Sequence, residues 1–375
     1  MLKIFQTSDI HIGAKLGWLR SKADEQRVEI LHTFSRIVEE TIKQKAKLLL
    51  IVGDLFDTPY PSQVSVSFVK NELDKLEKNF IYTVILPGNH DKLELGSVYL
   101  SKFANTQYIK IFQKKDIEVF DFAEIGVSVY AHAHQDKETF KKLKGFYSRY
   151  PGKLSQNIAM IHSGIQTARG FLTEVEITKE DIQNSGFDYI ALGDWHQPLE
   201  VSSEKTVSWY SGSPEILAKD QHKAGNYLEI DFASQVPVVT ISKISKRKIE
   251  NTILDLDKEK YGQNQDLEQK IIDLIQERAD TNTIQILQIK GKKDIAQKYD
   301  LENIKKIFKD QFFFLEVVDE SEFKLDPESL EKYPQELIVG RFIQTVTDKI
   351  KKEQDEEEVE ILKMVLQEGI KVLTE

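Results

Sequence analysis

Five short turns of the chain carry carboxylate, imidazole or amide side chains, which are groups that bind divalent metal ions. In chain order these residues are Asp9 and His11, Asp54 and Asp57, Asn89, His90 and Asp91, His162, and finally Asp194 and His196. A mixed set of this kind suits borderline or hard ions such as Mn²⁺, Fe²⁺ or Zn²⁺. So many donors exceed what one ion needs, and they fit two ions about 3.5–4 Å apart that share one bridging carboxylate. The sequence therefore predicts a two-metal site.

The spacing of these residues fits the ends of strands. In an extended segment alternate side chains point the same way, so Asp9 can reach one site together with His11, and Asp194 together with His196. A glycine precedes Asp54, and glycines likewise precede the third and fifth turns. Glycine allows the backbone to turn sharply where a strand ends.

Each turn taken singly has a purely structural explanation. A DxH triplet occurs by chance at many strand ends, asparagine and aspartate favour turns for backbone reasons, and GDxxD can cap the next helix. Coincidence does not explain the five turns together in this order, so we interpret them as one site.

The elements that must position this site are short strands alternating with helices. Six apolar runs that stop at polar or glycine-rich turns predict strands, namely LKIFQTSD, KLLLIVGD, IYTVILPGN, VSVYAHAH, NIAMIHSG and FDYIALGD. Apolar residues from Val28 to Ile42 recur at helical spacing and predict a helix from about Glu25 to Lys45. The alternation predicts a layered α/β domain over residues 1–235, with its site at the carboxyl ends of the strands.

The remaining chain predicts two further parts. An extended run, a helix near 266–278, the strand TIQILQIKG, a helix near 301–310 and the strand QFFFLEVVD predict a small α/β domain over residues 236–325. Residues 326–375 predict a pair of amphipathic helices, the first over about 337–352 and the second marked by apolar residues from Val359 to Leu373. These helices could fold back on the second domain or bind a partner helix.

Composition excludes several classes of protein. The 375-residue chain has a formal net charge of −10 and no cysteine, which excludes disulfides and thiolate metal sites. The negative charge argues against a dedicated DNA-coating protein but not against a nucleic-acid enzyme, because bound metal supplies positive charge. The N-terminus lacks the pattern of a signal peptide and no apolar run approaches the ~20 residues of a membrane helix, so we expect a soluble, cytoplasmic protein.

The order DxH, GDxxD, GNHD, a lone histidine and a final GDxH resembles the calcineurin-like metallophosphoesterase superfamily. Within it, GDLFDTPYPS and SGSPE are similar to the SbcD-type DNA repair exonucleases, the bacterial counterparts of the nuclease in double-strand-break repair complexes. The resemblance covers roughly residues 1–230. It implies a four-layer α/β/β/α sandwich, followed by a smaller α/β capping domain and a C-terminal helical tail.

The resemblance also implies a role for each site residue. One ion would be held by Asp9, His11 and His196, the other by Asn89, His162 and Asp194, with Asp54 as the bridge, His90 at the scissile phosphate and Asp57 orienting a neighbouring group. The ions would be two divalent cations, with Mn²⁺ preferred over Fe²⁺, Zn²⁺ or Mg²⁺. One residue departs from the family's Gly-His-x-His pattern, because Asp194 replaces the first histidine. An aspartate is a competent ligand, and it favours harder metals.

The implied function is a Mn²⁺-dependent DNA exonuclease, with endonuclease activity as a further expectation, that works with an SMC-like, SbcC-type coiled-coil ATPase and could form a homodimer. The alternatives are a metallophosphoesterase for nucleotides or phosphoproteins and an inactive scaffold of the same fold. Basic residues among aromatics in FKKLKGFYSRYPGK are candidates for DNA contacts, namely Lys141, Lys142, Lys144, Arg149 and Lys153. A solvated helix end with core-facing aromatics explains this segment equally well.

Overall fold

The computed structural model describes residues 2–114, 116–133, 139–149, 152, 154–164, 179–234, 236–258, 267–295, 297, 299–326, 329–330 and 333–374. The chain divides into two compact units, Met1–Ile249 and Glu250–Glu375. Each unit has its own sheets and its own core. Within the described ranges, no helix is long and apolar enough to cross a membrane.

The first sheet of the first unit has six strands in the order β12-β11-β1-β2-β3-β4. Its parallel strands are β1 (Lys3–Thr7), β2 (Leu48–Val52), β3 (Tyr82–Leu86) and β4 (Ile109–Ile111). Two antiparallel strands, β11 (Asn226–Asp231) and β12 (Val238–Lys243), extend the sheet beyond β1. Because β12 pairs with β11, the first unit continues past the boundary at residue 235 that the sequence suggests.

The second sheet also has six strands, in the order β5-β6-β7-β8-β10-β9. These strands are β5 (Glu118–Phe122), β6 (Val127–Ala131), β7 (Gln156–His162), β8 (Tyr189–Gly193), β9 (Leu199–Glu200) and β10 (Val207–Tyr210). The four inner strands β6, β7, β8 and β10 are parallel, and the two edge strands are antiparallel to their neighbours.

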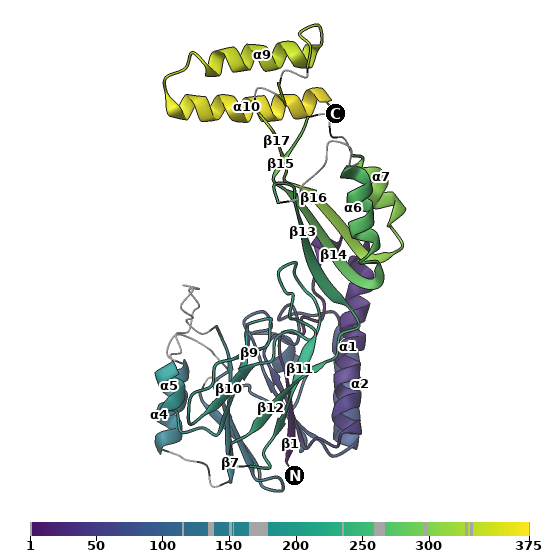
Figure 1. Ribbon diagram of the computed structural model, residues 1–375. Helices are drawn as coiled ribbons and strands as arrows, with labels where there is room; N and C mark the ends of the chain where they lie inside the picture. The colour runs from purple at the N-terminus through teal and green to yellow at the C-terminus, as the bar shows by residue number, and fades with distance from the viewer. Residues whose placement is uncertain are drawn as a thin grey trace. The chain divides into compact units, whose positions relative to one another are not determined.

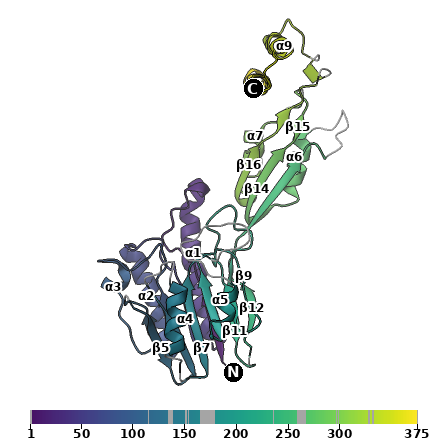
Figure 2. The same cartoon turned by 90° about the vertical axis from the view of Figure 1, so that its left-hand side faces the viewer.

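The two sheets pack face to face between two layers of helices. Helices α1 (Ala23–Lys43) and α2 (Gln63–Lys78) cover the first sheet, and α4 (Thr139–Arg149) and α5 (Lys179–Gln183) cover the second, as Figures 1 and 2 show. The side chain of Gln6 joins the sheets, because its Nε2 donates to Leu192 O at 3.1 Å and its Oε1 accepts from Tyr189 Oη at 2.6 Å. The predicted α/β/β/α sandwich is therefore confirmed.

Burial explains why these segments form their elements. Strands β2 (LLLIV) and β3 (YTVIL) are buried at every position, as expected for parallel strands covered on both faces. Helix α1 buries Ile30, Phe34, Ile37 and Val38, which recur every three or four residues along one face. Two short helices, η1 (Gly17–Lys22) and α3 (Val98–Ser101), lie in loops after β1 and β3.

The second unit contains a three-stranded sheet in the order β13-β14-β16, with β14 and β16 parallel. Its elements are β13 (Lys248–Asp255), α6 (Leu267–Gln276), β14 (Asp280–Lys290), β15 (Lys292–Lys293), α7 (Leu301–Ile307), β16 (Phe312–Asp319), β17 (Glu322–Phe323), α9 (Ile338–Ile350) and α10 (Glu356–Thr374). Helices α6 and α7 pack on one face of the sheet through Ile271, Ile275 and Ile304.

The C-terminal helices α9 and α10 pack against each other and against β17. Ile343 and Val346 of α9, Leu366 and Ile370 of α10, and Phe323 of β17 share one buried cluster. Both predicted tail helices are therefore present, and one apolar stripe of each folds back within the second unit.

Candidate metal centre

The carboxyl ends of five strands converge at one edge of the sandwich in the first unit. Strands β1, β2 and β3 of the first sheet and β7 and β8 of the second lead into the five turns singled out in the sequence. Because neighbouring strands within each set are parallel, their carboxyl ends lie on the same side. The structure brings together Asp9, His11, Asp54, Asp57, Asn89, His90, His162, Asp194 and His196.

Asp54 lies at the centre of this group. Its Oδ2 atom is 3.4 Å from His11 Nε2 and 3.3 Å from His162 Nε2, so one carboxylate oxygen faces two imidazoles from different sheets. Its side chain is only 2 % exposed, so these partners, and not bulk water, surround the carboxylate. This is the placement that a carboxylate shared by two ions requires.

Two groups of ligand atoms share Asp9, and one of them also contains Asp54. Asp9, His11 and His196 form one group, and Asp9, Asp54 and His162 form the other, with the atoms of each group within 4.8 Å of one another. A third group joins His11, Asp57 and His90.

The remaining two donors lie on the His162 side. Asn89 Oδ1 is 3.1 Å and Asp194 Oδ1 is 3.9 Å from His162 Nε2. His196 Nε2 is 3.7 Å from Asp9 Oδ1, and that oxygen lies 4.0 Å from His162 Nε2. Asp194 and His196 therefore face different groups although they are two residues apart.

The backbone brings these side chains together in a way that the sequence did not indicate. Asp9, His11, Asp54 and Asp194 have φ values of 53°, 52°, 51° and 89°, in the left-handed region that non-glycine residues rarely adopt. The convergence of Asp9 and His11 thus comes from a left-handed turn and not from the alternation of an extended strand. Strained conformations of this kind persist only where surrounding contacts enforce them, and they cluster at functional sites.

The glycines of these turns are required mainly because other atoms of the site lie too close to leave room for a Cβ atom. Gly53 has a φ of 82°, and a Cβ atom there would overlap the ring of His162. A Cβ atom at Gly88 would overlap the Asp54 carboxylate, and one at Gly193 would overlap the carbonyl of Val52. Gly53 has the positive φ of a sharp turn and also needs the space, whereas Gly88 and Gly193 need glycine for space alone.

Hydrogen bonds behind the imidazoles orient their Nε2 atoms towards the site. His162 Nδ1 lies 2.9 Å from Val52 O, and His11 Nδ1 lies 2.9 Å from Asp57 Oδ1. A carbonyl or carboxylate accepts from Nδ1–H and leaves the Nε2 lone pair free for a metal.

One observation indicates that these residues fit a metal ion. The Nε2 atom of His11 is buried, and it has no hydrogen-bond partner in the part of the chain that the structure describes. A buried polar atom without a partner is costly, and coordination of a cation would satisfy it.

The electrostatics of the group also favour cations. Burial lowers the pKa of His162, but the adjacent charge and hydrogen bond of Asp54 outweigh it and raise that pKa well above its usual range. Burial raises the pKa of Asp194, which lies close to the other carboxylates. The carboxylates around His162 therefore favour positive charge at this position.

Three residues of the site have roles that the sequence analysis missed. The buried Asp91 carboxylate accepts hydrogen bonds from Gly88 N at 2.7 Å, Phe56 N at 3.0 Å and Tyr99 Oη at 2.6 Å, so it ties together the loops after β2 and β3. The GNHD motif drew attention to Asp91 without revealing this role.

Ser8 and Gln221 are the other two missed residues. Ser8 Oγ donates to Asp9 Oδ2, and the buried side chain of Gln221 contacts Nδ1 of His196. No feature of the sequence distinguishes Gln221 from other polar residues of its loop.

The candidate DNA-contacting segment forms helix α4, whose aromatic residues pack inward. Phe146 and Tyr147 contact the core of the second sheet, and the Tyr147 ring centroid is 4.5 Å from that of Phe187. Lys141 and Lys142 are exposed and Lys144 is half-buried, whereas Lys153 and the side chain of Arg149 lie outside the described residues. The packing favours the alternative of a solvated helix with core-facing aromatics over base stacking.

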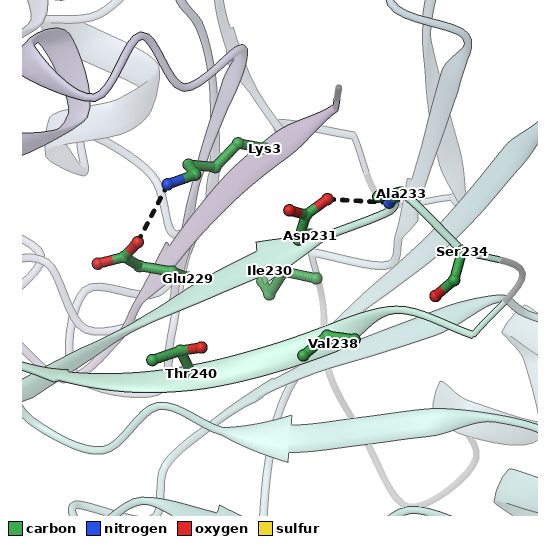
Figure 3. Close-up of a pocket in the computed structure, with 8 residues that line it drawn as sticks. All are labelled: Lys3, Glu229, Ile230, Asp231, Ala233, Ser234, Val238 and Thr240. Carbon is green, nitrogen blue, oxygen red and sulfur yellow. Dashed lines mark hydrogen bonds and ion pairs between the residues drawn. The ribbon is translucent and has the colours of Figure 1, made fainter.

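A separate pocket lies at the opposite end of the first sheet. It has a volume of about 270 Å³ and is lined by Lys3, Glu229, Asp231 and neighbouring residues, as Figure 3 shows. Lys3 Nζ forms an ion pair with Glu229 Oε2 at 3.4 Å and donates a hydrogen bond to Gln44 Oε1 at 2.7 Å. The ammonium group of Lys3 therefore has partners within the protein. Because Lys3 begins strand β1 and Asp9 follows its end, this pocket is not part of the metal centre.

The four-layer sandwich and the cluster of donors at its strand ends define a metallophosphoesterase. Residues 2–198 match the calcineurin-like phosphoesterase family, and the chain belongs to this family. The resemblance found in the motifs is thereby confirmed. Members of this family use a dinuclear metal centre, for which the structure provides candidate ligands.

The most informative relatives are archaeal proteins named DNA double-strand break repair protein Mre11. The protein from Sulfurisphaera tokodaii is 25 % identical over 66 % of this chain and 64 % of its own length. The protein from Methanocaldococcus jannaschii is 26 % identical over 64 % of this chain and 66 % of its own length. The chain thus spans about two thirds of the length of these relatives.

Two solved phosphatase structures show a distant likeness to part of this chain. A dimetal phosphatase from Danio rerio is 9 % identical, with a TM-score of 0.44 over 64 % of this chain and 96 % of its own. A purple acid phosphatase from yellow lupin seeds is 12 % identical, with a TM-score of 0.41 over 65 % of this chain and 52 % of its own.

Proposed function

We propose that this protein is a two-metal DNA nuclease that hydrolyses phosphodiester bonds in DNA repair, with Mn²⁺ as its preferred ion. The observation that carries the proposal is the shared Oδ2 atom of Asp54, which faces His11 and His162 at 3.4 and 3.3 Å. The names of the archaeal relatives point to DNA as the substrate.

We assign the ligands of the two ions from the donor atoms that surround Asp54 and His162. Asp9, His11 and His196 would hold the first ion, and Asn89, His162 and Asp194 the second, with Asp54 between them. Such ions supply a hydroxide for in-line attack and stabilise the departing oxygen.

His90 is the residue of the chain that we assign to the scissile phosphate. Its backbone N donates to Asp54 Oδ1 at 2.9 Å, which fixes the residue beside the centre, while its side chain is 48 % exposed. It can therefore reach a substrate, stabilise the charge on the phosphate and protonate the leaving oxygen.

Asp57 connects two of the imidazoles. Its Oδ1 atom lies 2.9 Å from His11 Nδ1 and 3.6 Å from His90 Nδ1. We assign Asp57 a positioning role, because it orients a proposed ligand and a proposed catalytic group with one carboxylate.

The test is digestion of end-labelled single- and double-stranded DNA with added Mn²⁺, beside a simple phosphodiester. The wild-type protein should cut DNA, and His90→Asn should bind the same amount of metal but lose most turnover, by a factor of about 10²–10⁴. His32→Asn is the matched control, because His32 lies on α1 outside the donor groups. Full activity of His90→Asn would refute its role, and hydrolysis of the simple phosphodiester without cleavage of DNA would favour a phosphodiesterase for small substrates.

We also propose that α10 binds the coiled coil of an SMC-like ATPase. The supporting observation is a second apolar stripe that remains exposed on α10, formed by Ile361, Met364, Val365 and Val372 at 46 %, 68 %, 45 % and 71 %. These residues repeat at helical spacing and suit a helix-in-groove or helix-on-helix contact.

Substitutions on this stripe test the partner more cleanly than deletion of the tail, because deletion would also uncover Phe323. Met364→Glu with Val372→Glu should abolish co-purification with the ATPase while metal-dependent DNA cleavage persists. Lys363→Glu, on the same helix, is the control for charge alone. Retained co-purification of the double variant would refute the assignment.

A further inference from the structure

Among the described residues, the two sheets of the first unit end in four edge strands, and three of these are protected against the addition of another strand. Strand β4 has three residues, β9 has two, and β5 carries the carboxylates of Glu118 and Asp121. Short or charged edge strands keep other chains from adding to a sheet. The fourth edge strand, β12, has neither protection, because it has six residues and its one charged residue, Lys243, lies at its end.

Strand β12 is also regular and exposed. It pairs with β11 over six consecutive residues without a bulge, and within the described ranges no strand pairs with its outer side. In an antiparallel ladder alternate residues direct their backbone N–H and C=O groups away from the partner strand, so the outer side of β12 presents a row of these groups. The side chains of Val238 and Ile241 are 60 % and 47 % exposed. Strand β12 is thus a template to which an extended segment can add.

A groove lined by basic residues lies beside the C-terminal end of β12. Its volume is about 400 Å³, and its lining includes Lys243 and Ile241 of β12 and Lys223 and His222 of the loop before β11. Ile241 and Lys243 are two residues apart, so they point to the same face of the strand. Lys243 Nζ donates to Ala224 O at 3.1 Å, and an ammonium group has further protons to donate to a ligand.

The charge of this groove indicates what binds there. A segment added beside β12 places alternate side chains on the face of Ile241 and Lys243, with the Cβ atoms of opposite residues about 5 Å apart. A carboxylate on that face can therefore reach the ammonium group of Lys243. A second copy of β12 would not supply it, because residues 236–248 contain no aspartate or glutamate. Nucleic acid would match the lysines but would leave the backbone groups and the apolar side chains of the strand unused.

We propose that β12 binds an extended acidic segment of another protein as an additional strand, with a carboxylate of that segment in the groove beside Lys243 and Lys223. Hydrogen bonds to the backbone of β12 give the contact its affinity, and the groove selects the acidic residue. The contact uses neither the metal ligands nor α10, so it goes beyond the proposed function and does not depend on it.

The probe is a phage library of random short peptides, selected against the intact protein. A recovered peptide is synthesised with a fluorescent label, and its affinity is measured by fluorescence anisotropy. We expect peptides rich in β-branched residues that also carry aspartate or glutamate. Methylation of every second backbone nitrogen of the peptide should abolish binding in one phase and spare it in the other, because only alternate N–H groups face β12.

Substitutions on the protein locate the site. Val238→Glu with Ile241→Glu should abolish binding, because the new carboxylates repel an acidic peptide on both faces of the strand. Both positions are exposed, so the fold should persist, which circular dichroism checks. Lys223→Gln with Lys243→Gln should weaken binding by about tenfold or more and reduce its dependence on salt.

The matched control is Lys78→Gln with Lys102→Gln, which removes two exposed lysines of the first unit outside the groove and should keep wild-type affinity. Binding that survives the double glutamate variant, or a selection that recovers no peptide dependent on β12, would overturn the inference. Self-association of the wild type that the glutamate variant loses would overturn it in favour of a second copy. Loss of DNA affinity in the lysine variant with unchanged peptide binding would overturn it in favour of phosphate groups.

Discussion

The buried carboxyl group of Glu215 should make the stability of the first unit depend on pH. Its Oε2 atom accepts from Thr33 Oγ1 at 2.9 Å, and the residue is fully buried. Burial raises the pKa of Glu215 to about 7 from an ordinary value of 4.5, and the nearby charge of Glu29 adds to the shift. Arg247 acts in the opposite direction but does not cancel the effect of burial.

The sign and size of the effect follow from these pKa values. Between pH 4.5 and 7 the folded protein retains a proton on Glu215 that the unfolded chain has released, so the free energy of unfolding falls as pH rises through this window. The difference between an ordinary pKa of 4.5 and one of about 7 corresponds to about 3 kcal/mol. Glu215→Gln removes the titrating group but keeps its shape, so the wild type should lose about 3 kcal/mol relative to this variant over the window.

The assay is urea unfolding of the metal-free protein at pH 4.5 and pH 8, monitored by tryptophan fluorescence. All three tryptophans, Trp18, Trp195 and Trp209, lie in the first unit, so the signal reports that unit alone. Glu204→Gln, an exposed glutamate, is the matched control and should follow the wild-type profile. A difference between wild type and Glu215→Gln that is the same at both pH values would refute the reasoning.

Three further substitutions test how the loops support the centre. Gly88→Ala should weaken metal binding strongly, because the new Cβ atom overlaps the Asp54 carboxylate; calorimetry showing wild-type affinity would contradict this. Asp57→Asn should reduce metal affinity by about 10–100-fold, because it weakens the hydrogen bond that orients His11, and equilibrium competition with a chelating dye measures the loss. Tyr99→Phe removes the 2.6 Å hydrogen bond to a buried carboxylate and should lower the free energy of unfolding by about 1.5–3 kcal/mol; a loss below about 0.5 kcal/mol in urea unfolding would show that this bond contributes little.

Periodicity made the strands and helices of the site-bearing unit predictable. Fully buried strands such as β2 appear in the sequence as continuous apolar runs, and the polar residues that follow them mark the strand ends. The helix predicted from Glu25 to Lys45 is observed at Ala23–Lys43, within the usual uncertainty of helix ends.

The sequence could not supply contacts that depend on tertiary packing. The left-handed backbone of Asp9 and His11 has no local signature, because its cause is a set of hydrogen bonds to the loop that follows β2. Likewise, the contact between Gln221 and His196 joins residues 25 positions apart, with strands β9 and β10 between them. The sequence left base stacking and core packing equally open for Phe146 and Tyr147, because the choice depends on which face of α4 the sheet covers.

The position of β1 in its sheet imposes an order on how this protein is made. Strand β1 pairs with β2 on one side and with β11 on the other, where Lys3 lies opposite Asp231. During synthesis β1 emerges before the rest of its sheet, yet one of its edges has no partner until residues 226–231 have left the ribosome. Pairing across so large a separation is slow, and an unpaired edge is prone to join other chains. One edge of this strand therefore stays unpaired until β11 has been made, and the centre to which Asp9 belongs is incomplete until Asp194 and His196 have been made.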